Sequence, residues 1–356
     1  MRAVPGSLVI SACCLAAWIV CDVEAGARVL MLSLVAAPLV DWLWRKTSRP
    51  KLISSSRLHS SNTATSPHTV VLSVWLLLQL GLISWALHAV SMRAVQGVQL
   101  MELMLFVGIA NGIFGMSVAH ELLHRTGRTA RIVADALLLT ALYGHFRVSH
   151  LNAHHRLVAT PADPATPIVG ETLYSFFGRS IVDGFALSLQ IETQRLAALG
   201  SRAYALRNFV VRSTFASVTI FAMIYAFFGA AAAGLFVGQA LIAIYTLEAL
   251  NYVQHYGLLR PDGIGMELTA EGSLAWDCDG PFTNWLLLDL GAHNEHHGEP
   301  KSATGSNVPT NPAQRLPGSY ILMIAVASFP PLWRAIMDRR VTLQRTTGER
   351  RRYGKT

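Results

Sequence analysis

The chain has 356 residues, 52% of them hydrophobic and 14% charged, and its formal net charge is +8. Soluble domains carry about 25% charged residues, so this composition excludes an ordinary soluble protein and predicts an integral membrane protein. The basic residues flank apolar segments and do not form a module mixed with aromatic residues, which argues against nucleic-acid binding and for contact with a lipid bilayer.

Six apolar segments predict six transmembrane helices, because each approaches the length of about 20 residues that a crossing needs. They cover residues 7–21, 29–44, 69–90, 95–119, 208–228 and 230–250, and the last two are expected to meet at a hinge at Gly229. Residues 131–149 are too short and interrupted for a crossing and predict a helix packed into a cap. Residues 316–337 contain Pro330-Pro331, which predicts an interfacial helix pair.

The distribution of basic residues predicts the orientation. If the N-terminus is cytoplasmic, the outer loops carry only Arg28 and Arg93, and nearly all other Lys and Arg are cytoplasmic. We therefore expect a single domain, 1–356, in a bacterial inner membrane, with both termini cytoplasmic. The fold class is all-α, with six transmembrane helices and a cytoplasmic, histidine-rich cap made of residues 120–207 and 251–356.

Asp41 and Glu102 are acidic residues that lie within predicted spans. An acid inside a membrane segment is a candidate functional residue by default. Asp41 and Glu102 each lie near one end of a span, so a side chain that reaches the membrane interface is an equally good interpretation.

The polar residues that stand out are histidines gathered in four segments on the predicted cytoplasmic side. A buried imidazole needs a partner for each ring nitrogen, and a metal ion supplies one. The nine candidate ligands are too many for one tetrahedral ion and fit two: His120, His124, His150, His154, His155, His255, His293, His296 and His297.

Spacing suggests how these histidines divide. In a regular helix residues four apart share a face, so His150 and His154 are expected to bind one ion, while His155 points about 100° away toward a second. Several side chains could hydrogen-bond to the ligand rings and orient them; these are Glu121, Glu248, Asp289 and Glu295, with His145 as a further orienting or structural residue.

The histidine segments resemble those of the membrane-bound alkane 1-monooxygenases and the related xylene monooxygenase hydroxylase components, within the fatty acid desaturase-like superfamily. The resemblance extends from about residue 100 to 340. It rests on His120-Glu-Leu-Leu-His124-Arg125, on Tyr143-Gly-His-Phe146 leading into His150-Leu-Asn-Ala-His154-His155, on Ala159-Thr-Pro-Ala-Asp-Pro164, and on the segment from Asn251 to Leu259.

The resemblance implies six spans, two iron ions held by the nine histidines, and insertion of one oxygen atom from O2 into an unactivated C–H bond. The substrate would be a hydrophobic small molecule such as an alkane or an alkyl-aromatic compound. The four cysteines contain no CxxC pair, so no iron–sulfur or rubredoxin-like centre is built into the chain. Electrons would come from a rubredoxin or ferredoxin-type donor and its NAD(P)H reductase.

The sequence departs from the family pattern at three places. Gln254 stands where alkane hydroxylases usually have Glu, the last motif reads Gly291-Ala-His-Asn-Glu-His-His297, and residues 260–281 match neither subfamily. These departures affect the identity of the substrate more than the type of reaction.

Three other functions stay open. A desaturase would use the same iron site, although acyl desaturases usually have two residues, not three, between the first histidine of the middle cluster and its pair. The run His120-Glu-Leu-Leu-His124 is also a zinc metalloprotease signature, with Glu121 as general base. A metal transporter would instead place polar ligands near the middle of the membrane.

Overall fold

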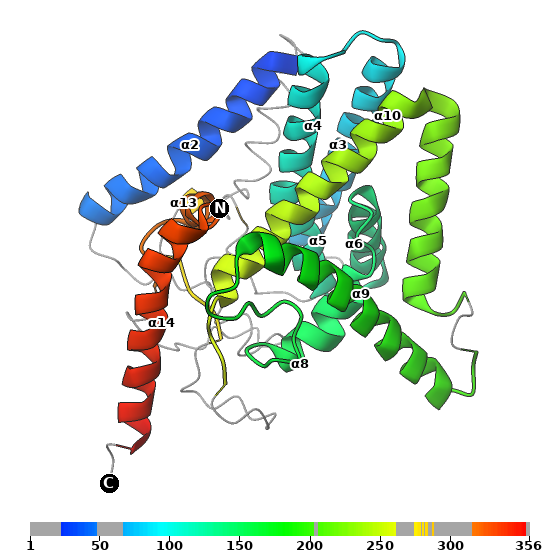
Figure 1. Ribbon diagram of the computed structural model, residues 1–356. Helices are drawn as coiled ribbons and strands as arrows, with labels where there is room; N and C mark the ends of the chain where they lie inside the picture. The colour runs from blue at the N-terminus through cyan, green and yellow to red at the C-terminus, as the bar shows by residue number, and fades with distance from the viewer. Residues whose placement is uncertain are drawn as a thin grey trace.

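The computed structural model describes residues 23–47, 67–202, 206–260, 274–278, 280, 282–283, 287 and 315–353. These residues form helices and loops, with one isolated bridge between Asp277 and Arg315 and no strand within the described ranges. The expectation of an all-α protein is confirmed. The helices shown in Figure 1 are α2 (Val23–Thr47), α3 (Pro67–Ser91), α4 (Val98–Ala110), η2 (Asn111–Gly115), α5 (Met116–Leu123), α6 (Arg128–Thr140), α7 (Phe146–Val148), η3 (Ser149–His154), α8 (His155–Leu157), α9 (Leu173–Ala198), α10 (Phe209–His255), α13 (Tyr320–Ala327) and α14 (Pro330–Tyr353).

Three helices in the described part of the chain are long and apolar enough to cross a membrane. They are Leu72–Ser91, Val98–Leu123 and Phe209–His255, and they contain the third to sixth predicted spans. The apolar part of α2, Leu32–Trp44, is shorter, and the predicted first span at 7–21 lies outside the described residues. A total of six spans therefore stays a prediction.

Helix α10 contains a sharp break at Gly229, as the sequence predicts. Gly229 has φ 85° and ψ 176°, a conformation that only glycine adopts without strain. Figure 1 shows the chain reversing there, so that the second limb crosses in front of α3 and α4. The first limb exposes apolar side chains such as Phe215 (65%) and Phe227 (79%). A helix with such a surface is suited to face lipid.

The second limb of α10 lies against α4 and η2 at very short range. A Cβ atom at Gly108 would lie 2.6 Å from the Ile242 Cβ, and one at Gly112 would lie 2.7 Å from the Thr246 Cβ. Small residues of this kind allow the backbones of membrane helices to approach closely. The packing fixes the helix that leads to His120 against the helix that leads to His255.

A buried polar cluster accompanies the π-helical turn η2. Asn111 Nδ2 donates to Gln239 Oε1 at 3.0 Å, and Gln239 Nε2 donates to the carbonyl oxygen of Thr140 at 2.8 Å. All three side chains are buried, and buried amides are tolerated when they are hydrogen-bonded. The cluster ties η2, α6 and α10 together just before the first histidine motif.

Two further expectations concern the cap. The apolar segment 131–149 does contain a helix, α6, which ends at Thr140 and packs on α5 and α3. The segment 316–337 forms the pair α13 and α14, bent by 120° at Pro330, so it is not one straight span. The 26-residue helix α9 was not predicted, because its mixed polar sequence gives no apolar run.

Asp41 is buried inside the protein, so the interpretation that places its side chain at the membrane interface is wrong. Its exposed fraction is 1%. The carboxylate accepts hydrogen bonds from the backbone N–H groups of Phe282 at 2.8 Å and Thr283 at 3.2 Å, and from the Thr283 hydroxyl. These donors replace water around the charge. Glu102, by contrast, is exposed on α4.

We expect Asp41→Ala to lower the thermal stability of the purified protein. The substitution leaves the N–H groups of the half-buried Phe282 and the buried Thr283 without their acceptor, and an unsatisfied buried group costs about 1–3 kcal/mol. Unfolding followed by intrinsic fluorescence in detergent measures the effect. Glu102→Ala, at an exposed acid of a neighbouring helix, is the matched control, and equal unfolding temperatures for both variants would contradict the role of Asp41.

Candidate metal centre

The first histidine motif stands at the end of α5, where the long apolar helix stops. His120 is on the last turn and is 5% exposed, and His124 is the C-terminal cap residue. Their ring centroids are 5.1 Å apart. The i,i+4 spacing thus brings both rings to one side of the helix end, as expected.

The middle motif lies on a π-helical turn, which changes how its histidines group. Residues Ser149–His154 form η3, and in a π-helix the hydrogen bonds run from i to i+5. His150 and His155 are five residues apart, and their Nε2 atoms lie 3.1 Å from each other. The expectation from a regular helix, with His155 pointing away from His150, is therefore wrong.

Three imidazoles converge on the ring of His150. Its Nε2 atom lies 3.0 Å from the Nε2 of His124 and 3.1 Å from that of His155, and its ring centroid is 4.4 Å from that of His120. One ring nitrogen carries either a proton or a lone pair and cannot donate to two neighbours. The ligand atoms of His120, His124 and His150 all lie within 4.8 Å of one another, which suits a shared cation.

His154 faces a different partner, His255 from the end of α10, at a centroid distance of 4.8 Å. The Nδ1 of His154 lies 2.8 Å from Asp163 Oδ2, and that of His255 lies 2.8 Å from the carbonyl oxygen of Leu274. When Nδ1 donates its proton to such an acceptor, Nε2 keeps the lone pair that binds a metal ion. Both rings are thus held in the tautomer that a metal site requires.

Asp163 is the functional residue that sequence reasoning did not select. Its carboxylate also accepts hydrogen bonds from Thr166 Oγ1 at 2.7 Å and from the backbone N–H of Ala165 at 3.1 Å. Burial raises the pKa of Asp163, but the neighbouring His154 and these donors outweigh it, so the pKa lies below its usual value. The only sequence signal was its place in the family-like run Ala159–Pro164.

The surroundings of His150 and His155 keep these two rings neutral. Burial is the largest cause that lowers the pKa of His150, and the neighbouring histidines lower it further. Burial likewise lowers the pKa of His155 to about 3. Neutral imidazole is the form that binds metal ions. Six imidazoles from three segments therefore form a donor set that fits a metal centre.

Comparison with known proteins agrees with this geometry. The sequence model of the family described as "Fatty acid desaturase" matches residues 99–311, which include all four histidine segments. The chain belongs to the fatty acid desaturase family. The resemblance found from the histidine motifs is confirmed at the level of the family.

Several relatives in the family carry more specific names. The chain is 33% identical to alkane 1-monooxygenase of Acinetobacter baylyi, over 72% of this chain and 63% of the relative. It is 34% identical to alkane 1-monooxygenase 1 of Alcanivorax borkumensis, over 71% and 62%. It is 28% identical to the xylene/toluene monooxygenase hydroxylase component of Pseudomonas putida, over 64% and 60%. The matches thus span less than two thirds of each relative's length.

The structure places the other predicted site residues of this family member as follows. Glu121 forms an ion pair with Arg125 at 2.6 Å, and the ring of His145 contacts those of Tyr143 and Phe185. Glu248 accepts a hydrogen bond from Tyr143. Five predicted residues lie outside the described residues: Asp289, His293, Glu295, His296 and His297.

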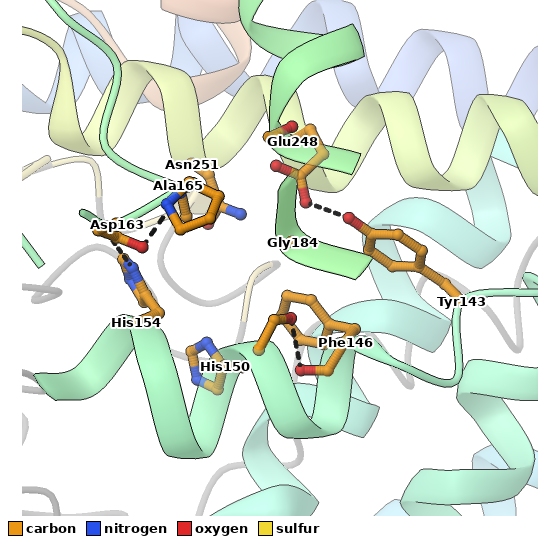
Figure 2. A pocket seen from close by; sticks show the side chains of 12 residues that line it. Tyr143, Phe146, His150, His154, Asp163, Ala165, Gly184, Glu248 and Asn251 are labelled. Carbon is orange, nitrogen blue, oxygen red and sulfur yellow. Dashed lines mark hydrogen bonds and ion pairs between the residues drawn. The ribbon is translucent and has the colours of Figure 1, made fainter. Parts of the chain in front are cut away.

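A small pocket lies beside the middle histidines. It encloses about 350 Å³ of space not filled by protein atoms, part of it open to solvent. Figure 2 shows His150 and His154 on one side of it and Glu248 on the opposite side. The remaining lining residues are Tyr143, Phe146, Ser149, Asp163, Pro164, Ala165, Ser180, Gly184 and Asn251. The metal centre therefore borders a partly polar space.

Proposed function

We propose that the chain is a membrane-bound non-haem di-iron monooxygenase that inserts one atom of O2 into an unactivated C–H bond of a hydrophobic substrate. The observation that carries this proposal is the convergence of His120, His124, His150 and His155 beside the His154–His255 pair. The names of its relatives, alkane and xylene/toluene monooxygenases, support the reaction type.

The proposed ligands of the two iron ions are the nine motif histidines. Six lie in the described cluster, and His293, His296 and His297 would complete the set. Bound iron would supply the binding and reduction of O2. The chain's own residues keep His150 and His155 neutral through burial and orient His154 through Asp163 and His255 through the Leu274 carbonyl. They also enclose the site in apolar helices that limit the access of water.

We further propose that this single domain, 1–356, has six spans in a bacterial inner membrane, with its metal site and both termini in the cytoplasm. A rubredoxin or ferredoxin-type protein, reduced by an NAD(P)H-dependent reductase, would then donate electrons from the aqueous side. An alkane or alkyl-aromatic substrate would enter from the bilayer. The apolar helices and the absence of a CxxC pair from the sequence support this arrangement.

The contacts of Glu121 and the positions of the histidines argue against two of the alternative functions, a zinc protease and a metal transporter. A zinc protease needs Glu121 as a general base, but the Glu121 carboxylate is paired with Arg125 at 2.6 Å and 3.1 Å. A transporter would carry its ligands in mid-span, whereas His120, His124 and His255 stand at helix ends. A desaturase would use the same metal site. Its product would be dehydrogenated, whereas a hydroxylase forms an alcohol.

Metal content and oxygen labelling test the proposed function. We expect about two iron ions per purified chain, since nine imidazoles exceed the needs of one ion. Incubation with ¹⁸O₂, NADH, rubredoxin, its reductase and a panel of alkanes, alkylbenzenes and terpenes should give a product alcohol that carries the label. Stoichiometric zinc without iron would contradict the metal assignment. Products that are dehydrogenated, or that carry no label, would contradict monooxygenation.

A further inference from the structure

The pocket beside the metal centre contains an acid that the arrangement of ligands does not use. Glu248, on the second limb of α10, is 2% exposed and faces the pocket opposite His150 and His154 (Figure 2). From the sequence we expected Glu248 to hydrogen-bond to a ligand ring. Its hydrogen bond is instead with Tyr143, whose hydroxyl donates to Glu248 Oε1 at 2.9 Å.

Burial of Glu248 favours the proton-carrying form of its carboxyl group. In the described part of the chain, no Lys or Arg forms an ion pair with it. In the described structure Glu248 Oε1 accepts the Tyr143 hydrogen bond, and Glu248 Oε2 is buried without a hydrogen-bond partner. The uncharged side chains of Ser180 and Asn251 line the same pocket. A buried carboxylate without a cation is costly, and a neutral carboxylic acid is not.

The proposed reaction consumes protons at a buried site. Hydroxylation follows RH + O2 + 2e⁻ + 2H⁺ → ROH + H2O, so two protons must reach the metal centre in each turnover. His120, His150 and His154 are each at most 5% exposed. His124 and His155 are half-buried, so the requirement for proton carriers applies to the pocket side of the centre, where His150 and His154 are buried. Protons do not cross apolar packing without polar groups to carry them.

We propose that Glu248 is the proton donor of this pocket and that Tyr143 stabilises the carboxylate left behind. This inference rests on the proposed function. The acid proton leaves Glu248 Oε2 for a water molecule in the pocket, and the O–H bond electrons stay on the carboxylate. The Tyr143 hydrogen bond strengthens as that charge forms, because charge-assisted hydrogen bonds are about twice as strong as neutral ones.

Two features of the pocket suit this role. Burial raises the pKa of Tyr143, so the phenol keeps its proton and serves as a donor. The lining residues Ser149, Pro164 and Ala165 are half-buried, whereas the others are buried. A proton from solvent can therefore enter on the side of those three residues and restore the acid.

The test compares three substitutions in the full-length, iron-loaded protein. Glu248→Gln keeps the shape but has no acid proton, Glu248→Asp keeps the acid, and Tyr143→Phe removes only the stabilising hydroxyl. Glu102→Gln, at an exposed glutamate of α4, is the matched control. The measurements are iron per chain, labelled product and hydrogen peroxide per NADH oxidised, and the infrared C=O band of protonated carboxyl groups in H2O and D2O.

We expect Glu248→Gln to retain its iron and to lower product formation by about 10²-fold, a typical loss for a general acid, with peroxide released instead. The infrared difference between wild type and this variant should contain a protonated carboxyl band. Glu248→Asp should recover part of the product yield. Tyr143→Phe should shift the same band to higher frequency, a signature independent of turnover.

Other outcomes would overturn the inference. Unchanged product yield in Glu248→Gln, or no protonated carboxyl band in the difference spectrum, would exclude Glu248 as proton donor while the proposed function stands. Loss of iron from Glu248→Gln would assign Glu248 to metal binding. If Glu248→Gln does not fold, the other two variants test the proposal. An unshifted carboxyl band in Tyr143→Phe, together with no product from Glu248→Asp, would then contradict it. A wild type that forms no labelled product would overturn the proposed function itself.

Discussion

Replacing His154 with Ala should abolish oxygen insertion and reduce iron binding to at most part of the wild-type content. His154 is 3% exposed, its ring centroid lies 4.8 Å from that of His255 and 5.6 Å from that of His150, and its Nδ1 is held by Asp163. It therefore joins His255 of α10 to the other histidines of the middle motif. Removing its Nε2 takes a proposed ligand from a buried position.

Iron analysis of the purified variant, together with labelled-product formation, measures this effect. His88→Ala is the matched control, because His88 is an exposed histidine in the last turn of α3. The control should keep its full iron content and activity. A His154→Ala protein with wild-type activity would refute the assignment of His154 as a ligand, whatever its stability.

Replacing Asp163 with Asn should weaken iron binding by about 10–100-fold, the usual effect of losing a carboxylate that orients a ligand histidine. The Asp163 carboxylate accepts hydrogen bonds from three donors, on His154, Thr166 and Ala165. An amide has only one acceptor oxygen, and its NH2 group would face one of these donors. The His154 ring would then lose its fixed tautomer or its orientation.

Competition with an iron chelator measures the affinity of each variant. Asp183→Asn provides the comparison, because Asp183 is an exposed acid on α9. The surrounding loop should keep its shape in both proteins, since Arg179 holds it through Glu171 and through the carbonyl oxygens of Pro164 and Thr166. Equal affinities in the two variants would show that the Asp163 contact does not orient a metal ligand.

Much of the fold was predictable because it depends on local composition. The long apolar segments appear as α3, as the continuous helix through α4, η2 and α5, and as α10. The break at Gly229 follows from a glycine between two apolar runs, and the bend before α14 follows from Pro330-Pro331. Helix α9 was missed because its stability comes from contacts with α10 and η3 and not from an apolar pattern.

The candidate site was predictable in its chemistry but not in its geometry. Six of the nine histidines selected from their motifs lie together in the described structure. Their proximity could be predicted because several imidazoles in an apolar chain are typical of a metal site. Their grouping was predicted incorrectly for His155, since the π-helical turn that brings it to His150 cannot be recognised from spacing alone.

The sequence by itself determined the membrane class, the main apolar helices and the histidine donors, because hydropathy and residue type act over short stretches of chain. Only the tertiary structure decided which side chains orient those donors. Asp41 accepts hydrogen bonds from Phe282, 241 residues away, and Glu248 meets Tyr143 across 105 residues. Asp163 meets the His154 ring because the loop after the π-helical turn folds back on it. A buried polar group is stable only where it has hydrogen-bond partners. For Asp41 and Glu248 these partners come from distant segments, so tertiary packing decides whether they are present.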